Sequence, residues 1–177
     1  MLRSLVGSEM CIRDRFKGNV EENLRMAKPD ATKEEMEAVL QKVNLLGFLQ
    51  TQNGLQTELL EKAGNLSGGQ CQRLVIARAL LRSDSAVYIF DEAASNIDVE
   101  SEELIMNVIH ELAKTKTVLL ISHRLANVVQ SDQIYFLKNG TICERGTHAE
   151  LMEQNGAYRH LYDSQMVLEN YGKQGNA

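Results

Sequence analysis

Two short apolar runs constrain the fold of this chain more than any other feature. They cover residues 86 to 90 and 117 to 121, and neither alternates apolar with polar side chains. A run of this kind predicts a strand that is buried on both faces, as in a parallel sheet. Between the runs, Asp98 can cap an amphipathic helix whose apolar face includes Ile105 and Ile109. The order strand, helix, strand predicts an α/β fold with parallel strands.

A small helical region is expected before the first run. Thr32 and Glu35 have the spacing of a capping box, and apolar side chains then recur every three or four residues up to Val43. A second helix is expected to begin at Ser67, with Leu74 on its apolar face. These signals predict a helical subdomain over residues 16 to 82.

The C-terminal part is expected to form a hairpin and further helices. Asn139 and Gly140 separate two apolar segments, which is a strong signal for a tight hairpin turn. Thr147 and Glu150 repeat the capping-box spacing, and a last helix is expected after Gly156. We therefore expect a core at residues 83 to 156 and a C-terminal helix with a tail at residues 157 to 177.

The composition narrows the classes of function. Of the 177 residues, 44% are apolar and 24% are charged, which is typical of a globular domain. The formal net charge of -5 argues against nucleic acid as a partner, because no basic stripe offsets it. No run of 18 apolar residues occurs, so a membrane role is expected to come through a partner or through sequence that is missing here. The 3 cysteines form no CxxC pair, which fits a reducing compartment.

The most specific motif is the run Leu66, Ser67, Gly68, Gly69 and Gln70. A serine before two glycines at a helix start can cap the helix, and the glycines let a phosphate approach its unbonded N–H groups. Alone, such a run is more often an ordinary helix N-terminus. Followed by residues 72 and 73 and residues 77 to 80 (Gln-Arg and Ala-Arg-Ala-Leu), it resembles the signature motif of ABC-type ATPases.

A pair of carboxylates, Asp91 and Glu92, follows the first apolar run. Ligand chemistry in α/β folds lies at the carboxyl ends of the strands. Without context the pair would be an ordinary helix start, but residues 87 to 92 resemble the Walker B strand of the same family. The resemblance implies that Asp91 holds Mg²⁺ through water and that Glu92 is the general base.

Two further positions resemble elements of the family. Residues 95 to 98 (Ser-Asn-Ile-Asp) stand where the family has its D-loop, which implies a place for Asp98 at the nucleotide in addition to its capping role. His123 follows the second run and resembles the switch histidine that contacts the γ-phosphate. A lone histidine after a strand is otherwise most often structural.

Residues 16 to 24 and Thr57-Glu58 are similar to segments of exporter-type cassettes. The resemblance as a whole runs from Phe16 to about Tyr171. It implies a partial P-loop NTPase fold, with a RecA-like parallel sheet, flanking helices and the helical subdomain. It also implies the C-terminal part of an ATP-binding and ATP-hydrolysing domain that powers export, with ATP and Mg²⁺ as cofactors. The implied partners are a second cassette, paired head to tail, and a transmembrane domain. The implied location is the cytoplasmic face of a cell membrane, such as a bacterial inner membrane.

Two features depart from a complete cassette. No GxxxxGK[ST] phosphate loop occurs, so we expect the chain by itself neither to bind ATP tightly nor to hydrolyse it. Back-translated in one frame, Ser4 to Arg15 matches the end of a transposon-based sequencing-library adapter. We therefore interpret residues 1 to 15 as an assembly artefact rather than a polar N-terminal arm, and we expect the gene to continue upstream of Phe16.

Two alternative functions remain open from the sequence. A non-transport ABC ATPase would be favoured by a coiled-coil insertion or a second cassette, and neither occurs. A non-catalytic cassette that completes a partner's ATP site would be favoured by a change at Glu92 or His123, and both residues are present.

Overall fold

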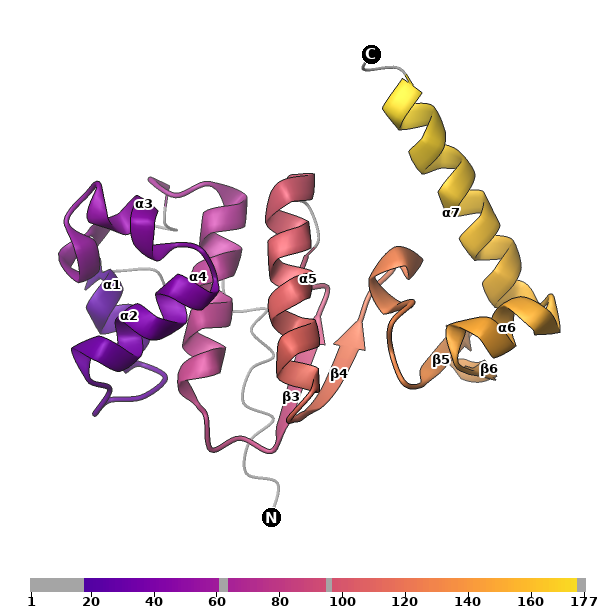
Figure 1. The fold of residues 1–177 in the computed structure, drawn as a ribbon, viewed down its shortest axis with the longest axis horizontal. Coiled ribbons are helices and arrows are strands. Elements are labelled where there is room, and N and C mark those ends of the chain that lie inside the picture. Colours follow the sequence, from indigo (N-terminus) through magenta and orange to yellow (C-terminus); the bar gives the residue numbers. More distant parts are fainter. Residues whose placement is uncertain (1–17, 61–63, 95–96, 175–177) are drawn as a thin grey trace. The chain divides into compact units, whose positions relative to one another are not determined.

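The computed structural model describes residues 18–60, 64–94 and 97–174, which fall into two compact units that divide after Ile121. The first unit contains the helices α1 to α5 and the strands β1 to β4 (Figure 1). The second contains β5, β6, α6 and α7. Among the described helices, none combines the length and the apolar character needed to cross a membrane.

Helices dominate the first part of the first unit. They are α1 (Val20–Arg25), α2 (Lys33–Lys42), α3 (Leu46–Gln50) and α4 (Gly68–Leu81), together with a 3₁₀ turn at Gly54–Gln56. Two short strands, β1 (Gly18–Asn19) and β2 (Glu58–Leu59), pair in antiparallel orientation. The predicted capping box at Thr32 and Glu35 is confirmed in both directions. The core of this part is aliphatic, and its fully buried members include Leu24, Met36, Leu40, Leu49 and Leu74.

The second part of the first unit is a parallel pair of strands with a helix between them in the chain. β3 (Val87–Asp91) pairs with β4 (Thr117–Ile121) in the register Asp91 to Ile121, and α5 (Val99–Ala113) connects them. Tyr88 and Phe90 of β3 belong to the same hydrophobic core as Ile105 of α5. The strand, helix, strand order predicted from the apolar runs is confirmed.

The prediction that both strands are buried on two faces is wrong for the described residues. Alternate side chains on both strands are exposed: Val87 by 55%, Ile89 by 47%, Leu119 by 49% and Ile121 by 46%. The described residues pack against only one face of the pair. An unalternating apolar run therefore faces a helix on one side and leaves large aliphatic groups uncovered on the other.

The second unit is a hairpin followed by two helices. β5 (Ile134–Lys138) and β6 (Thr141–Gly146) are antiparallel, and the turn residues Asn139 and Gly140 both have positive φ, 52° and 77°. These angles are those of the turn predicted from the Asn-Gly pair. Thr147 caps α6 (His148–Gln154) through the predicted capping box, and α7 (Ala157–Gln174) completes the unit.

Candidate functional site

The signature-like run forms the start of α4. Ser67 is the N-cap, and its Oγ accepts the N–H of Gln70 at 3.1 Å while the Gln70 Oε1 accepts the N–H of Ser67 at 2.8 Å. Ser67 and Gly68 are exposed, whereas Leu66 packs against the hydrophobic core. The Ser67 hydroxyl and the first N–H groups of a 14-residue helix thus lie at the surface, where the helix dipole favours an anion.

The two glycines of this run have different surroundings. Gly69 is buried, and a Cβ at this position would lie 2.8 Å from Ser101 Cβ and 3.2 Å from Asp98 Oδ2. From the sequence, both glycines are expected to let a phosphate approach the helix start. For Gly69 the structure adds a packing reason, because only a residue without a side chain lets α4 approach the start of α5 this closely.

Asp98 lies at this contact as the N-cap of α5. Its carboxylate accepts the N–H of Ser101 at 2.8 Å, so the predicted capping role is confirmed. The hydrogen bonds from the Ser101 N–H and hydroxyl lower the pKa of Asp98, and the Arg73 guanidinium acts in the same direction. Of the other residues of the D-loop-like run, Ile97 is partly buried against the hydrophobic core, and Ser95 and Asn96 lie outside the described part of the chain.

The side chain of Arg73 on α4 bonds to the loop that follows α2. The sequence alone does not predict this role. Its Nε donates to the Gly69 carbonyl oxygen at 3.2 Å, and its Nη1 donates to the carbonyl oxygen of Asn44 at 3.0 Å. Asn44 has a φ of 52° and follows α2. The arginine after the signature-like run therefore holds the loop after α2 against α4.

Asp91 and Glu92 lie together at the carboxyl end of β3, and both are exposed. The Glu92 N–H donates to the Ile121 carbonyl oxygen at 2.9 Å. Glu92 also has a φ of 49°, a left-handed backbone conformation that is uncommon for a residue with a Cβ. Strained positions of this kind concentrate at functional sites, so this geometry marks Glu92 as a candidate.

The metal-binding capacity of this pair is limited. Across the described ranges, no group of three or more His, Cys, Asp or Glu side chains could hold a metal ion by itself. Two adjacent exposed carboxylates still fit Mg²⁺, which keeps several waters and is usually held by one or two carboxylates plus substrate phosphates.

His123 lies in the second unit with an exposed side chain, on a loop fixed by hydrogen bonds. The hydroxyl of Ser122 accepts the N–H of Arg124 at 3.1 Å. The side chain of Gln165 on α7 contacts the backbone on both sides of Arg124, at His123 and Leu125. No local sequence signal identifies Gln165, because it is 42 residues from His123.

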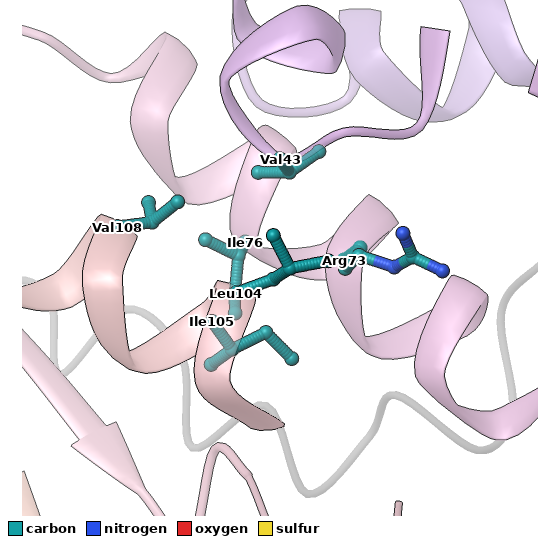
Figure 2. A pocket seen from close by; sticks show the side chains of 6 residues that line it. All are labelled: Val43, Arg73, Ile76, Leu104, Ile105 and Val108. Carbon is teal, nitrogen blue, oxygen red and sulfur yellow. The ribbon is translucent and has the colours of Figure 1, made fainter. Parts of the chain in front are cut away.

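A hollow between α2, α4 and α5 has neither carboxylate nor histidine side chains in its lining. Figure 2 shows it lined by aliphatic side chains, with the guanidinium of Arg73 directed away from them. The lining residues are Val43, Arg73, Ile76, Leu104, Ile105 and Val108. The hollow is too narrow for a water molecule, so it is a packing seam between helices rather than a nucleotide site.

Known proteins resemble this chain over most of its length. The family described as ABC transporter matches residues 4–95, a range that begins inside the stretch interpreted as an adapter. An uncharacterized ABC transporter ATP-binding protein of Haemophilus influenzae is 51% identical over 162 residues, which are 92% of this chain and 29% of that protein. An ATP-dependent lipid A-core flippase of Mannheimia succiniciproducens is 44% identical over 152 residues, or 85% of this chain and 26% of that protein.

A solved structure agrees with these matches. A bacterial Atm1-family ABC exporter with ATP bound superposes with a TM-score of 0.78 at 29% identity, covering 86% of this chain and 27% of the exporter chain. The chain thus spans less than a third of the length of each of these relatives. The likeness supports the partial P-loop NTPase fold expected from the sequence. The chain belongs to the ABC transporter family, as part of its ATP-binding domain.

Proposed function

We propose that this chain contributes the catalytic carboxylate, the switch histidine and the signature motif to an ATPase that powers export across a membrane. The observation that carries the proposal is the geometry of Glu92. Its exposed side chain follows a parallel strand, on a left-handed backbone fixed by the hydrogen bond to Ile121. A residue with a Cβ rarely adopts this conformation, and such positions cluster at functional sites. A glutamate here therefore supports a catalytic role for its carboxylate.

In the proposed reaction, water attacks the terminal phosphorus of ATP and Glu92 accepts a proton from that water. The bond between this phosphorus and the bridging oxygen breaks, so ADP and inorganic phosphate leave. The neighbouring Asp91, the last residue of β3, would hold Mg²⁺ through water. When bound, Mg²⁺ neutralises charge on the phosphate oxygens. General-base catalysis of this kind contributes about 10²–10⁴-fold to a rate.

The signature-like run and Asp98 act on the ATP held mainly by a second cassette. The exposed Ser67 hydroxyl and the N–H of Gly68 supply hydrogen bonds to phosphate at the positive end of α4. Gly69 lets α4 approach α5 closely. Asp98, at the start of α5, therefore lies close to the start of α4. Leu66 and Gln70 hold the run in place, through the core and the capping box respectively. His123 acts with Asp91 and Glu92 on the chain's own ATP.

We also propose the domain organisation and the partners that the resemblance implies. Residues 16 to 82 form the helical subdomain, 83 to 156 the ATPase core and 157 to 177 a C-terminal helix and tail. The partners are a second cassette in head-to-tail arrangement and a transmembrane domain, so the chain works at the cytoplasmic face of a cell membrane. The flippase and the ABC exporter among the proteins similar to this chain support this setting.

The test is steady-state ATP hydrolysis by the intact protein that contains this chain. Glu92→Gln keeps the size of the side chain and removes the base, so turnover is expected to fall by about 10²–10⁴-fold. Glu100→Gln is the matched control, because Glu100 is also exposed and lies in the first turn of α5. Equal turnover in Glu92→Gln and the control would refute the proposed role of Glu92.

A further inference from the structure

The side chain of Gln165 uses both ends of its carboxamide on the loop that carries His123. Its Nε2 donates to the His123 carbonyl oxygen at 2.8 Å, and its Oε1 accepts the N–H of Leu125 at 2.9 Å. The two bonds fix the peptide groups on either side of Arg124. A single side chain from α7 therefore sets the backbone that presents the His123 ring, while the ring itself stays exposed.

A second set of bonds holds the same loop from within. The hydroxyl of Ser122 lies 3.1 Å from both the N–H and the carbonyl oxygen of Arg124. Ser122 restrains the turn locally, but it belongs to the loop and moves with it. Gln165 belongs to a separate helix and therefore determines where the loop lies within the second unit.

The helix that carries Gln165 is itself anchored. The carboxylate of Glu144 on β6 accepts the N–H of Ala157 at 2.6 Å and of Tyr158 at 3.0 Å, and so caps the first turn of α7. Tyr158 is fully buried, and its hydroxyl lies 2.8 Å from His148 Nδ1. Because residues seven apart lie on the same helical face, the anchor at Tyr158 also orients Gln165.

We propose that Gln165 is a positioning residue for His123, and that α7 thereby sets the efficiency of ATP hydrolysis. The inference rests on the proposed role of His123. Groups that are misplaced by about 1 Å can lose up to 10²-fold in rate, so a side chain that fixes the backbone at the switch histidine affects turnover without touching nucleotide. The effect falls on the chemical step rather than on ATP binding.

The experiment uses the intact protein with Gln165→Leu, which removes both hydrogen bonds. Gln165→Glu is the second variant, because it keeps the size and the acceptor but loses the donor to His123. Gln154→Leu makes the same change at an exposed glutamine at the end of α6 and is the control. We expect both Gln165 variants to lower kcat about tenfold with little change in KM for ATP. In Gln165→Leu, the Leu125 amide should exchange hydrogen about tenfold faster than in the control.

A double-variant cycle with His123→Ala separates this inference from the function on which it rests. If Gln165 acts through His123, then adding Gln165→Leu to His123→Ala causes no further loss of kcat. If His123→Ala alone leaves kcat unchanged, the proposed role of His123 is wrong and the inference falls with it. If His123→Ala lowers kcat but the Gln165 variants do not, or if the two losses multiply, the role of Gln165 alone is wrong.

Discussion

Glu92 donates its backbone N–H to the carbonyl oxygen of Ile121 at 2.9 Å while its own φ is 49°. The hydrogen bond continues the β3–β4 ladder one residue beyond the last residue of β3. Glycine would satisfy this backbone at lower cost, because an L residue in the left-handed region loses roughly 1–2 kcal/mol. Glutamate at this position thus exchanges some stability for a carboxylate at the end of the strand.

Substitutions at Glu92 measure how much its left-handed backbone conformation lowers the free energy of unfolding. We expect Glu92→Gly to unfold with a free energy about 1 kcal/mol higher than Glu92→Ala, because alanine keeps the strained Cβ and glycine does not. The measurement is urea denaturation of the chain carrying each variant. The same pair at Glu103, which is exposed in the interior of α5, should give the opposite order, since glycine is the poorer helix former. An alanine variant at residue 92 as stable as the glycine variant would contradict the strain.

Gly69 gives a second prediction about stability. Gly69→Ala would place a methyl group against Ser101, so we expect a loss of about 1–3 kcal/mol in the free energy of unfolding. Gly68→Ala is the control at an exposed neighbour and should be much milder. Ser101→Gly removes the obstructing side chain, so the loss from Gly69→Ala should shrink in that background. Equal losses in both backgrounds would mean that Ser101 is not the obstacle.

Ser67 combines a cap with a proposed phosphate contact, and two substitutions separate these roles. Ser67→Asp keeps the cap, so stability should change little, but its negative charge opposes phosphate and should lower ATP turnover of the intact protein about 10- to 100-fold. Ser67→Ala should lower turnover too. Because it removes the cap, it should also lower the free energy of unfolding by about 1 kcal/mol. Thermal denaturation and an ATPase assay on the same preparations check both. Unchanged turnover in Ser67→Asp would remove Ser67 from the proposed site.

Asp98 predicts a dependence of stability on acid. Its pKa is lowered in the folded chain by the hydrogen bonds from Ser101, so its carboxylate stabilises the fold above the ordinary pKa near 3.8. This contribution is lost as the pH falls through the lowered pKa. Asp98→Asn keeps an acceptor for the Ser101 N–H but cannot titrate. Any stability advantage of the native chain should therefore shrink as the pH falls below about 4, in urea denaturation at several pH values. A difference that is constant from pH 7 to 2 would contradict this role.

Local signals in the sequence predicted the local structure well. The capping box at Thr32 and the turn at Asn139 are each specified by residues within a few positions of one another, so no distant contact is needed to recognise them. The strand, helix, strand order followed from the apolar runs for the same reason. The positions of the candidate residues at the ends of strands and helices were therefore predictable from the sequence.

Features that depend on distant neighbours were not predictable. The burial of Ile89 depends on what packs over its face of the strand pair. The described residues cover only the opposite face of that pair. The packing reason for Gly69 requires Ser101, which lies on another helix. The contact of Gln165 with the His123 loop spans 42 residues and follows from how α7 is anchored. Each of these features is set by tertiary packing, and a local sequence pattern does not predict contacts between distant segments.

The most direct test of the account is to identify the nucleotide bound to the intact Glu92→Gln protein after incubation with ATP and Mg²⁺. If Glu92 is the general base, the variant should bind ATP with an affinity close to that of the native protein and retain it as ATP, whereas the native protein should release phosphate. Recovery of ADP and phosphate from Glu92→Gln at the native rate would contradict the central claim that this chain supplies the catalytic carboxylate.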